Sequence, residues 1–333
     1  MPKSLTDCIP RLARKKALVI GDVALDEYIT GKATRMSREA PVPVLEFESR
    51  RYIAGGAANP AANIISLGGR ATLIGVVGAD EAGQRLRGIL AAGGIDSGLI
   101  TCASRPSTVK TRILAQMGLR FPQQIARIDT LTRAQIPPET EAQISNLVAG
   151  QIATVDVALL SHYHGGLLTP ALVGRLRQVC AAQDVLLTAD VQGDFDTFAG
   201  LDVIKCNADD ARRALNRDLR DDADFSQGAL DLHERLGIQR ATIITRGAQG
   251  ATLAESGRTY NCPAPRVSDV YDTVGAGDTA IATITLGLAG GLSARDAVRL
   301  ANVASGIVVR HLGNYTPTPE QLRASITKGY GSS

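Results

Sequence analysis

Short apolar runs alternate with amphipathic segments along most of this chain. The runs are rich in β-branched residues, as buried strands are, and the amphipathic segments repeat apolar residues with a helical period. The predicted strands are 17–20, 72–77, 155–160, 185–189, 203–205 and 241–245. The predicted helices are 59–67, 81–90, 170–182, 208–215 and 228–236, with a polar linker over 218–224. Alternating strands and helices imply parallel pairing, so we expect an α/β fold with three layers (α/β/α) around a doubly covered, mostly parallel sheet.

Three segments follow a different period. Residues 42–52, 108–115 and 124–129 alternate apolar and polar positions over much of their length. Strands with one polar, solvent-exposed face do not belong in the centre of a sheet that is covered on both sides. We expect a small separate β-sheet, inserted at about 28–54 and 106–130, that closes over a cleft as a lid. The whole chain, 1–330, is predicted to be one domain, and the uncovered strands of the lid are predicted to pair with a second copy as a homodimer.

Composition narrows the class of protein. The length of 333 residues and a hydrophobic content of 44% suit one large globular α/β domain. A net charge of +3, dispersed basic residues and an aromatic content of 4% argue against a nucleic-acid partner. No apolar run approaches the roughly 18 residues of a membrane span, and basic residues interrupt the N-terminal region where a secretory signal would be apolar. The sequence therefore predicts a cytoplasmic protein without a membrane or nucleic-acid partner.

Cysteines and histidines give little support for a metal centre. The five cysteines are far apart and without metal-ligand spacing, which favours reduced thiols used as small apolar side chains. His162 and His164 would point to one face if they lay on a strand, as two metal ligands could. No third ligand is evident, so a metal role for this pair is disfavoured.

The candidate chemistry centres on residues 272–278, Asp-Thr-Val-Gly-Ala-Gly-Asp, which precede a long apolar helical pattern. Gly275, Ala276 and Gly277 allow a tight turn with bare backbone N–H groups at a helix start, which is an anion site. Asp278 lies in the first helical turn, where the helix dipole would keep its carboxylate ionised. A carboxylate beside an anion site suits an enzyme that deprotonates a hydroxyl while the amides stabilise a transferred phosphoryl group. An acidic cap on an ordinary N-terminal turn is the alternative.

Other polar and glycine residues follow the predicted strands, at the ends where open α/β sheets bind ligands. Of the two main runs, Gly21-Asp-Val-Ala-Leu-Asp26 follows the first strand, and Gly55-Gly-Ala-Ala-Asn59 precedes the first predicted helix. Together with residues 272–278, they resemble the signatures of the ribokinase-like (PfkB) family of carbohydrate kinases, from about residue 16 to about 325. The N-terminal signature, Gly-Gly-x-x-x-Asn, is one residue shorter in this chain. Within that family the likeness is closest to the heptose 7-phosphate kinases, and residues 39–44, Lys110-x-Arg112 and Arg127-x-Asp129 add to it.

This resemblance implies phosphate transfer from ATP, with Mg²⁺, to a hydroxyl of a sugar or sugar phosphate. Asp278 would be the base, and Gly275, Ala276 and Gly277 would form the anion hole. The residues implied for substrate binding are Asp22, Asp26, Gly55, Gly56 and Asn59, with Lys110, Arg112 and Arg127 on the lid available for an acceptor's phosphate. The residues implied for nucleotide binding are Asn207, Thr245, Gly247, Gly250 and Asn302. Asp210 stands where the family has a glutamate that organises Mg²⁺ through water, and it is one methylene shorter.

Two lysines of the heptose kinases are missing. The chain has His162-Tyr-His-Gly-Gly166 where they carry Asp-Tyr-x-Lys-Gly, and Asp190-Val-Gln-Gly193 where they carry Asp-Pro-Lys-Gly. His164 replaces one of these charges only when it is protonated. A kinase for another sugar or a nucleoside, and a non-catalytic sugar sensor on a kinase scaffold, therefore stay open. A nicotinamide oxidoreductase is disfavoured because the first strand lacks the Gly-x-Gly-x-x-Gly turn that binds a pyrophosphate.

Overall fold

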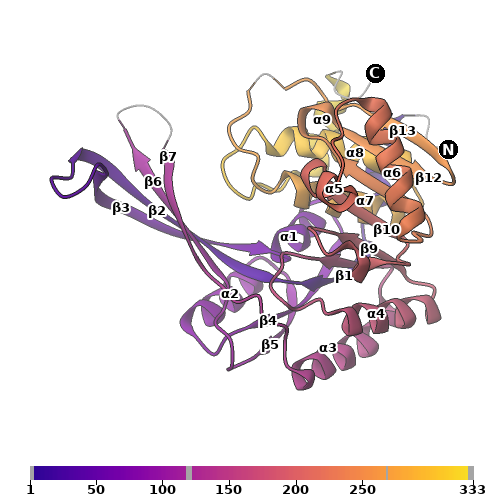
Figure 1. Cartoon of the computed structure of the whole chain (residues 1–333), viewed down its shortest axis with the longest axis horizontal. Coiled ribbons are helices and arrows are strands. Elements are labelled where there is room, and N and C mark those ends of the chain that lie inside the picture. Colours follow the sequence, from indigo (N-terminus) through magenta and orange to yellow (C-terminus); the bar gives the residue numbers. More distant parts are fainter. Residues whose placement is uncertain (1–3, 118–121, 268, 329–333) are drawn as a thin grey trace.

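The computed structural model describes residues 4–117, 122–267 and 269–328 (Figure 1). Within these residues, a nine-stranded sheet has the order β13-β12-β11-β10-β9-β8-β1-β4-β5, and a four-stranded sheet has the order β3-β2-β6-β7. The strands of the large sheet are β1 Lys16–Gly21, β4 Arg70–Val77, β5 Asp96–Thr101, β8 Val157–Ser161, β9 Leu186–Asp190, β10 Val203–Asn207, β11 Ala241–Thr245, β12 Ala251–Glu255 and β13 Arg258–Cys262. The strands of the small sheet are β2 Val23–Met36, β3 Pro43–Gly56, β6 Val109–Gln116 and β7 Gln123–Thr130.

The large sheet is mostly parallel and is covered on both faces, as predicted. Strands β4, β1, β8, β9, β10 and β11 pair in parallel, and β12 and β13 add an antiparallel edge. Along β1, Leu18 and Ile20 pack into one hydrophobic core and Ala17 and Val19 into another on the opposite face. The uninterrupted apolar run of this strand therefore reflects burial on two sides.

One outer layer consists of helices from the middle of the chain, and the other combines helices from its beginning and its end. Residues of α3, α4, α5 and α6 contribute to the core on one face, and residues of α1, α2, α7, α8 and α9 to the core on the other. The helices are α1 Ala58–Ser66, α2 Glu81–Ala92, α3 Pro138–Gln151, α4 Pro170–Ala182, α5 Ala208–Leu215, α6 Asp222–Arg235, α7 Ala276–Ala289, α8 Ala294–Val308 and α9 Pro319–Thr327. In these ranges no helix is both long and apolar enough to cross a bilayer.

Capping explains where several helices begin. The Thr169 side chain accepts the Leu172 N–H, and Pro170 occupies the first helical position of α4, as predicted for its start. The polar linker predicted over 218–224 is partly wrong. The Asp221 side chain accepts the Asp224 N–H, so α6 starts at Asp222 with acidic residues in its first turn, where they favour the helix dipole.

The small sheet projects from the body as a long blade (Figure 1), which confirms the predicted separate β-sheet. Strands β2 and β3 pair antiparallel, β2 pairs with β6 in parallel, and β7 closes the other edge. Strand β2 was not predicted, and Asp26, expected in a loop, lies inside it. Residues 23–26 are all buried, so they lack the alternation of polar and apolar side chains that identifies a lid strand.

The five cysteines are buried and free, in agreement with the prediction of reduced thiols. His162 and His164 follow β8 and do not lie on a strand, which corrects the geometry expected for them. His164 has a left-handed backbone with φ of 56°. The two rings are nevertheless close, with centroids 4.5 Å apart.

Candidate active site

Asp278 lies at the centre of a polar cluster at the carboxyl ends of the parallel strands. It occupies the first turn of α7 and is 8% exposed. One carboxylate oxygen, Oδ2, accepts a hydrogen bond of 2.7 Å from Asn59 Nδ2, on α1. The other, Oδ1, accepts the hydroxyl of Tyr163, in the loop that follows β8. The fold thus joins the C-terminal acid to the N-terminal polar residues, as the sequence predicts.

The glycine turn before α7 is shaped by close approach. Gly275 has φ of 81°, and a Cβ atom on it would lie 2.9 Å from Asn59 Nδ2. Only glycine combines this left-handed backbone with such a contact. The Ala276 N–H is bound to the Thr273 carbonyl oxygen at 3.3 Å, whereas the N–H groups of Gly275 and Gly277 have no partner in the described part of the chain. At the positive end of the helix, these two amides are the ones available to an anion.

Burial dominates the electrostatics of Asp278. Desolvation, followed by the charge of Asp190, raises the pKa of Asp278 to about 6, against hydrogen bonds from Tyr163 and Asn59 and the charge of Lys205. The expectation that the helix dipole alone keeps this acid ionised is therefore corrected. A carboxylate with a pKa near the working pH is still mostly ionised at pH 7, and it is a better proton acceptor than an ordinary aspartate.

A buried ion pair lies directly beside the turn. Lys205 Nζ, in β10, is 2.7 and 2.8 Å from the two carboxylate oxygens of Asp190, at the end of β9, and both residues are at most 4% exposed. The same ammonium lies 3.4 Å from the Gly277 carbonyl oxygen. Burial raises the pKa of Asp190, and Lys205 opposes this shift. Sequence reasoning missed Lys205, although a lysine inside an otherwise apolar predicted strand was a signal.

A second chain of hydrogen bonds joins the lid to the base. Arg112 Nη1, on β6, donates to Asp26 Oδ1 at 2.7 Å, and Asn314 Nδ2 donates to Asp26 Oδ2 at 2.9 Å. Asn314 Oδ1 in turn lies 3.4 Å from Asn59 Nδ2. Gly55 makes room for this arrangement, because a Cβ atom there would lie 2.2 Å from Asp26 Oδ2. Asn314 was missed, since no recognisable motif surrounds it.

The carboxylate of Asp22 accepts hydrogen bonds from three backbone N–H groups. Its Oδ2 accepts the N–H groups of Tyr163 and Gly165, each at 2.9 Å, and its Oδ1 accepts that of Leu167 at 3.3 Å. Gly56, with φ of 58°, allows the chain to pass close by, since a Cβ there would lie 2.2 Å from the Asp22 carbonyl oxygen. In this structure Asp22 fixes the loop that carries Tyr163, and a direct contact with sugar stays a prediction.

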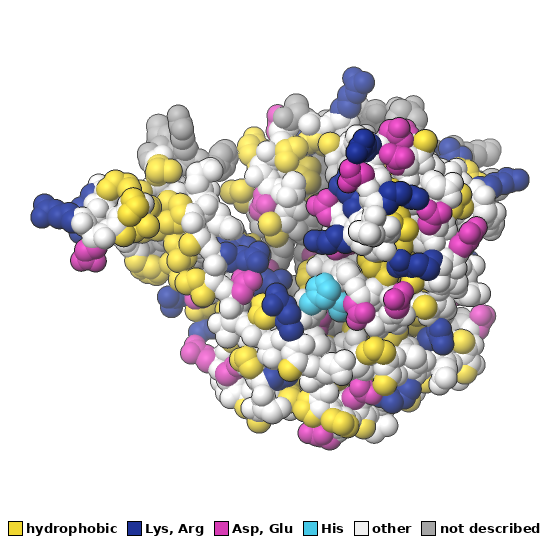
Figure 2. Space-filling model, in the orientation of Figure 1, with side chains coloured by type: hydrophobic (Ala, Val, Ile, Leu, Met, Phe, Trp, Pro, Cys, Tyr) yellow, Lys and Arg dark blue, Asp and Glu magenta, His cyan; other side chains and the backbone are white. Residues whose placement is uncertain are grey.

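The basic residues of the lid share one face of its sheet. Lys110 is in register with Asp26, and Arg112 is in register with Arg127. The Lys110 ammonium lies 4.9 Å from the centre of the Tyr163 ring. Arg127 is half exposed and pairs with Asp129 at 2.9 Å. Figure 2 shows basic and acidic side chains around the hollow where the lid meets the body.

The predicted nucleotide residues lie at the ends of β10 and β11 and on α8. Thr245 Oγ1 donates to the Cys206 carbonyl oxygen at 3.1 Å. A Cβ atom on Gly247 would have no other atom within 4 Å, so the space beside this glycine is open. Asn302 Nδ2 donates to the Cys262 carbonyl oxygen at 2.8 Å, and a Cβ on Gly250 would lie 2.1 Å from that oxygen. Asn302 and Gly250 therefore both hold the backbone at Cys262, and their contact with a nucleotide stays a prediction.

Two carboxylates, Asp190 at the end of β9 and Asp210 after β10, are the candidates for a metal ion held through water, and this role stays a prediction. Asp210 Oδ2 accepts Asn207 Nδ2, and its Oδ1 accepts Arg213 Nη2, each at 2.6 Å. Asp190 is near enough for the charge of Asp210 to raise its pKa. Among the residues that the structure describes, no three His, Cys, Asp or Glu side chains form a metal cage. Mg²⁺ that binds together with a nucleotide needs only one or two protein carboxylates, because water and phosphate oxygens supply the other ligands. Asp190 and Asp210 are the two carboxylates available for this.

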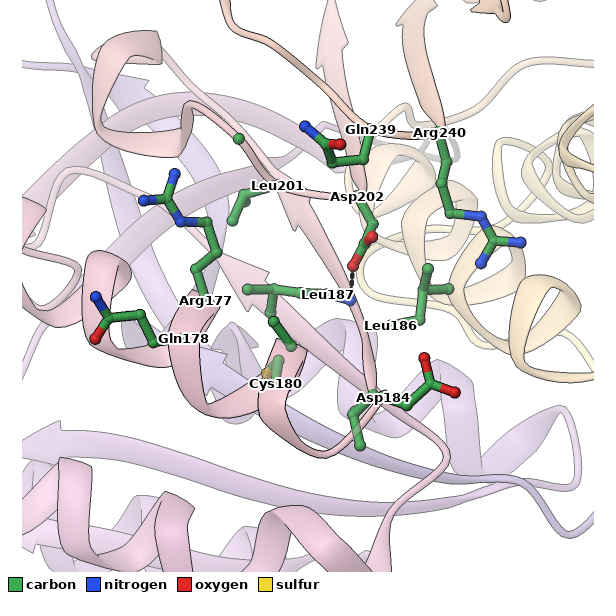
Figure 3. A pocket seen from close by; sticks show the side chains of 13 residues that line it. Arg177, Gln178, Cys180, Asp184, Leu186, Leu187, Leu201, Asp202, Gln239 and Arg240 are labelled. Carbon is green, nitrogen blue, oxygen red and sulfur yellow. Dashed lines mark hydrogen bonds between the residues drawn. The ribbon is translucent and has the colours of Figure 1, made fainter.

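A cavity of about 650 Å³ lies at the opposite ends of the strands (Figure 3). It is lined by α4 and by the starts of β9 and β10, including Arg177, Leu187 and Asp202, whose carboxylate accepts the Leu187 N–H at 2.8 Å. The polar cluster instead surrounds the last residues of those strands, Asp190 and Asn207. The cavity is therefore not part of the candidate active site.

Replacing Lys205 with methionine tests the buried ion pair. Lys205→Met leaves Asp190 buried without its partner, and we expect a loss of about 3–5 kcal/mol in the free energy of unfolding at pH 7. Because unpaired burial raises the folded-state pKa of Asp190 further, the loss should shrink as the pH falls and Asp190 becomes protonated. Denaturant unfolding at pH 5 and 7 measures both effects. The double variant Asp190→Asn/Lys205→Met is the control and should recover most of the stability; equal losses in both variants would contradict the pairing.

Comparison with known proteins places this site in a family. The pfkB family carbohydrate kinase profile matches residues 14–321. The D-beta-D-heptose 7-phosphate kinase of Bordetella bronchiseptica is 38% identical over 322 residues, which cover 95% of this chain and 98% of that protein. The Bifunctional protein HldE of Hyphomonas neptunium is 35% identical over 331 residues, 98% of this chain but only 66% of that protein.

The chain thus spans about two thirds of the length of such bifunctional relatives. Solved structures share the fold at lower identity. Phosphofructokinase-2 from Escherichia coli superposes with a TM-score of 0.76 at 18% identity, over 95% of this chain and 99% of the other. Ribokinase from Arabidopsis thaliana gives 0.72 at 17% identity, over 94% and 99%. The ribokinase-like fold and the family profile agree, and the chain belongs to the pfkB family of carbohydrate kinases.

Proposed function

We propose that the chain transfers the γ-phosphoryl group of ATP to a hydroxyl of a sugar phosphate, with a heptose 7-phosphate as the favoured acceptor. The observation that carries this proposal is the position of Asp278, which is buried, hydrogen-bonded through both oxygens and adjacent to the free amides of the glycine turn. The similarity to a D-beta-D-heptose 7-phosphate kinase along nearly its whole length supports the choice of acceptor.

The residues divide the reaction between them. Asp278, ionised above about pH 6, accepts the proton of the attacking hydroxyl. The N–H groups of Gly275 and Gly277 stabilise the charge on the transferred phosphoryl oxygens, as phosphoryl transfer depends mainly on positioning and charge stabilisation. Asp26 and Asn59 orient the sugar through its hydroxyls.

The nucleotide lies along the ends of β10 and β11 in this proposal. Asn207, Thr245, Gly247, Gly250 and Asn302 form its site. Mg²⁺ bound with the nucleotide would neutralise charge on the phosphates, and Asp210 and Asp190 would hold it through water. Lys205 places an ammonium group beside the turn, where it is paired with Asp190.

Removing the base tests the reaction. We expect Asp278→Asn to lower kcat by about 10²–10⁴-fold, because a positioned base typically contributes that factor. The affinity for the acceptor should change little, since the amide has the same shape. Steady-state ADP release and calorimetric binding measure the two quantities. Asp209→Asn, an exposed aspartate on α5, is the matched control. Undiminished turnover in Asp278→Asn would remove Asp278 from the mechanism.

The acceptor's phosphate is assigned to the basic face of the lid, with Lys110 nearest to Tyr163 and the base. We expect Lys110→Met to raise KM for heptose 7-phosphate at least tenfold, with a much smaller effect for the unphosphorylated heptose. Lys32→Met, at an exposed position of β2, is the control. An acceptor panel that includes fructose 6-phosphate, ribose and a nucleoside tests the substrate class directly. Equal KM changes for phosphorylated and unphosphorylated acceptors would remove Lys110 from phosphate binding.

We further propose a homodimer through the lid. Large apolar side chains are exposed on its strands and turns, with Phe47 at 66%, Ile128 at 58%, Met36 at 58% and Val42 at 52% exposure. Ile128 is in register with Thr111, so it lies on the face opposite Lys110 and Arg112. An uncovered apolar face and two open edges, β3 and β7, suit pairing with a second copy.

A charge on the exposed lid tests this pairing. We expect Phe47→Asp to convert the dimer to a monomer in sedimentation equilibrium, because a carboxylate cannot be buried in an apolar interface without a partner. Lys32→Asp is the control for added charge on the lid. A native chain that sediments as a monomer at all concentrations would contradict the dimer.

A further inference from the structure

Tyr163 connects the lid to the base, and no role was predicted for it from the sequence, although it matches the tyrosine of the Asp-Tyr-x-Lys-Gly motif. Its backbone N–H is bound by Asp22, its hydroxyl donates to Asp278, and its ring lies under the Lys110 ammonium. Three different elements therefore contact this one residue: the residue after β1 through its backbone, and the start of α7 and the lid strand β6 through its side chain. A tyrosine used only to fill space would not need all three contacts.

The hydroxyl of Tyr163 remains a donor at working pH. Burial and the nearby charges of Asp278 and Asp190 raise the pKa of this phenol well above its ordinary value. The proton thus stays on Tyr163, and the hydrogen bond runs toward the carboxylate. A donor of this kind favours the ionised form of Asp278, in opposition to the burial and to the charge of Asp190 that favour the protonated form.

The groups around the Asp278 carboxylate are of two kinds: some act on it by their charge and others donate hydrogen bonds to it. Asp190 faces it from β9, Lys205 from β10, and Asn59 from α1. Asp26 and Arg112 are connected to the carboxylate only indirectly: Asn59 bonds to Asn314, Asn314 to Asp26, and Asp26 to Arg112. Of all these, Tyr163 and Asn59 donate directly to the carboxylate oxygens. Changing Tyr163 to phenylalanine therefore removes one bond to the base and leaves the surrounding charges in place.

We propose that Tyr163 is a positioning residue for Asp278, which holds the carboxylate ionised and correctly oriented and transmits the position of the lid, through Lys110, to the base. This inference rests on the proposed function, because orienting a base matters only if Asp278 accepts a proton. Lid residues then act in two ways: Lys110 attracts the acceptor's phosphate and also secures the ring that holds the base. Closing the lid and preparing the base become one event.

The pH dependence of kcat/KM distinguishes this role from simple packing. In Tyr163→Phe, the acidic limb should move to higher pH by about one unit, because the lost donor had favoured the ionised base. The rate loss should therefore be greater at pH 6 than at pH 8. Titration of the nucleotide and the acceptor is common to all variants and cancels in the comparison. Tyr260→Phe, on the edge strand β13, is the control for the substitution. A uniform loss at every pH, or no loss, would assign Tyr163 to packing and overturn the proposal.

A double-variant cycle tests the connection to the lid. Lys110→Met should move the acidic limb upward in the wild-type background and have little further effect in Tyr163→Phe. Equal shifts in both backgrounds would show that Lys110 acts on Asp278 by charge alone and would overturn the coupling.

A measurement without turnover separates this inference from the proposed reaction. Carboxyl ¹³C NMR of aspartate-labelled protein, with the Asp278 signal assigned by its loss in Asp278→Asn, gives the titration of the base directly. The titration midpoint should be higher in Tyr163→Phe than in the wild type and in Tyr260→Phe. An unchanged or lower midpoint overturns the role of Tyr163. If no acceptor is phosphorylated, the proposed function fails, and the NMR titration still decides whether Tyr163 controls the ionisation of Asp278.

Discussion

The burial of one carboxylate, Asp278, is the constraint on which the rest of the site depends. An ionised group in an apolar setting is costly unless donors surround it, and here the donors come from α1 and from the loop after β8. Gly275 is glycine because Asn59 must approach the base past it, and Gly55 is glycine because Asp26 needs the space. Glycines that are far apart in the sequence are thus required by the same polar cluster around Asp278, at the start of α7.

The layers of the fold and the residues at the centre of the site could be predicted from the sequence. Apolar runs such as 17–20 predict strands because burial on both faces removes polar positions, and Leu18 and Val19 indeed enter different cores. The runs at 55–59 and 272–278 were expected to share one site because together they resemble the two signatures of the family, although the first run ends β3 of the small sheet. Asn59 and Asp278, 219 positions apart, are in contact. The layers could be predicted because periodicity and handedness are local properties with global consequences, whereas the convergence of the two runs rested on the family resemblance.

Other features depend on contacts that no local pattern encodes. Tyr163 and Asn314 look ordinary in sequence, and their importance comes from partners 115 and 288 residues away. The first residues of β2 are buried on both sides, so that strand lacks the alternation seen in its neighbours. The pKa of Asp278 was expected to stay low on the strength of the helix dipole. That effect is worth at most about 2 kcal/mol, and the desolvation of a buried carboxylate exceeds it.

The missing lysines illustrate how charge can be supplied from another element. His164 was the imidazole considered as a replacement, which requires that it be protonated, and burial lowers the pKa of its neighbour His162. Lys205 Nζ lies 3.4 Å from the Gly277 carbonyl oxygen, and it is paired there with both carboxylate oxygens of Asp190. The lid contributes two more cations, and each is tied to a group of the site, Lys110 to Tyr163 and Arg112 to Asp26. The sheet therefore supplies a balanced ion pair on one side of the reacting centre and the lid supplies cations on the other, so the lid is an electrostatic part of the site as well as a cover.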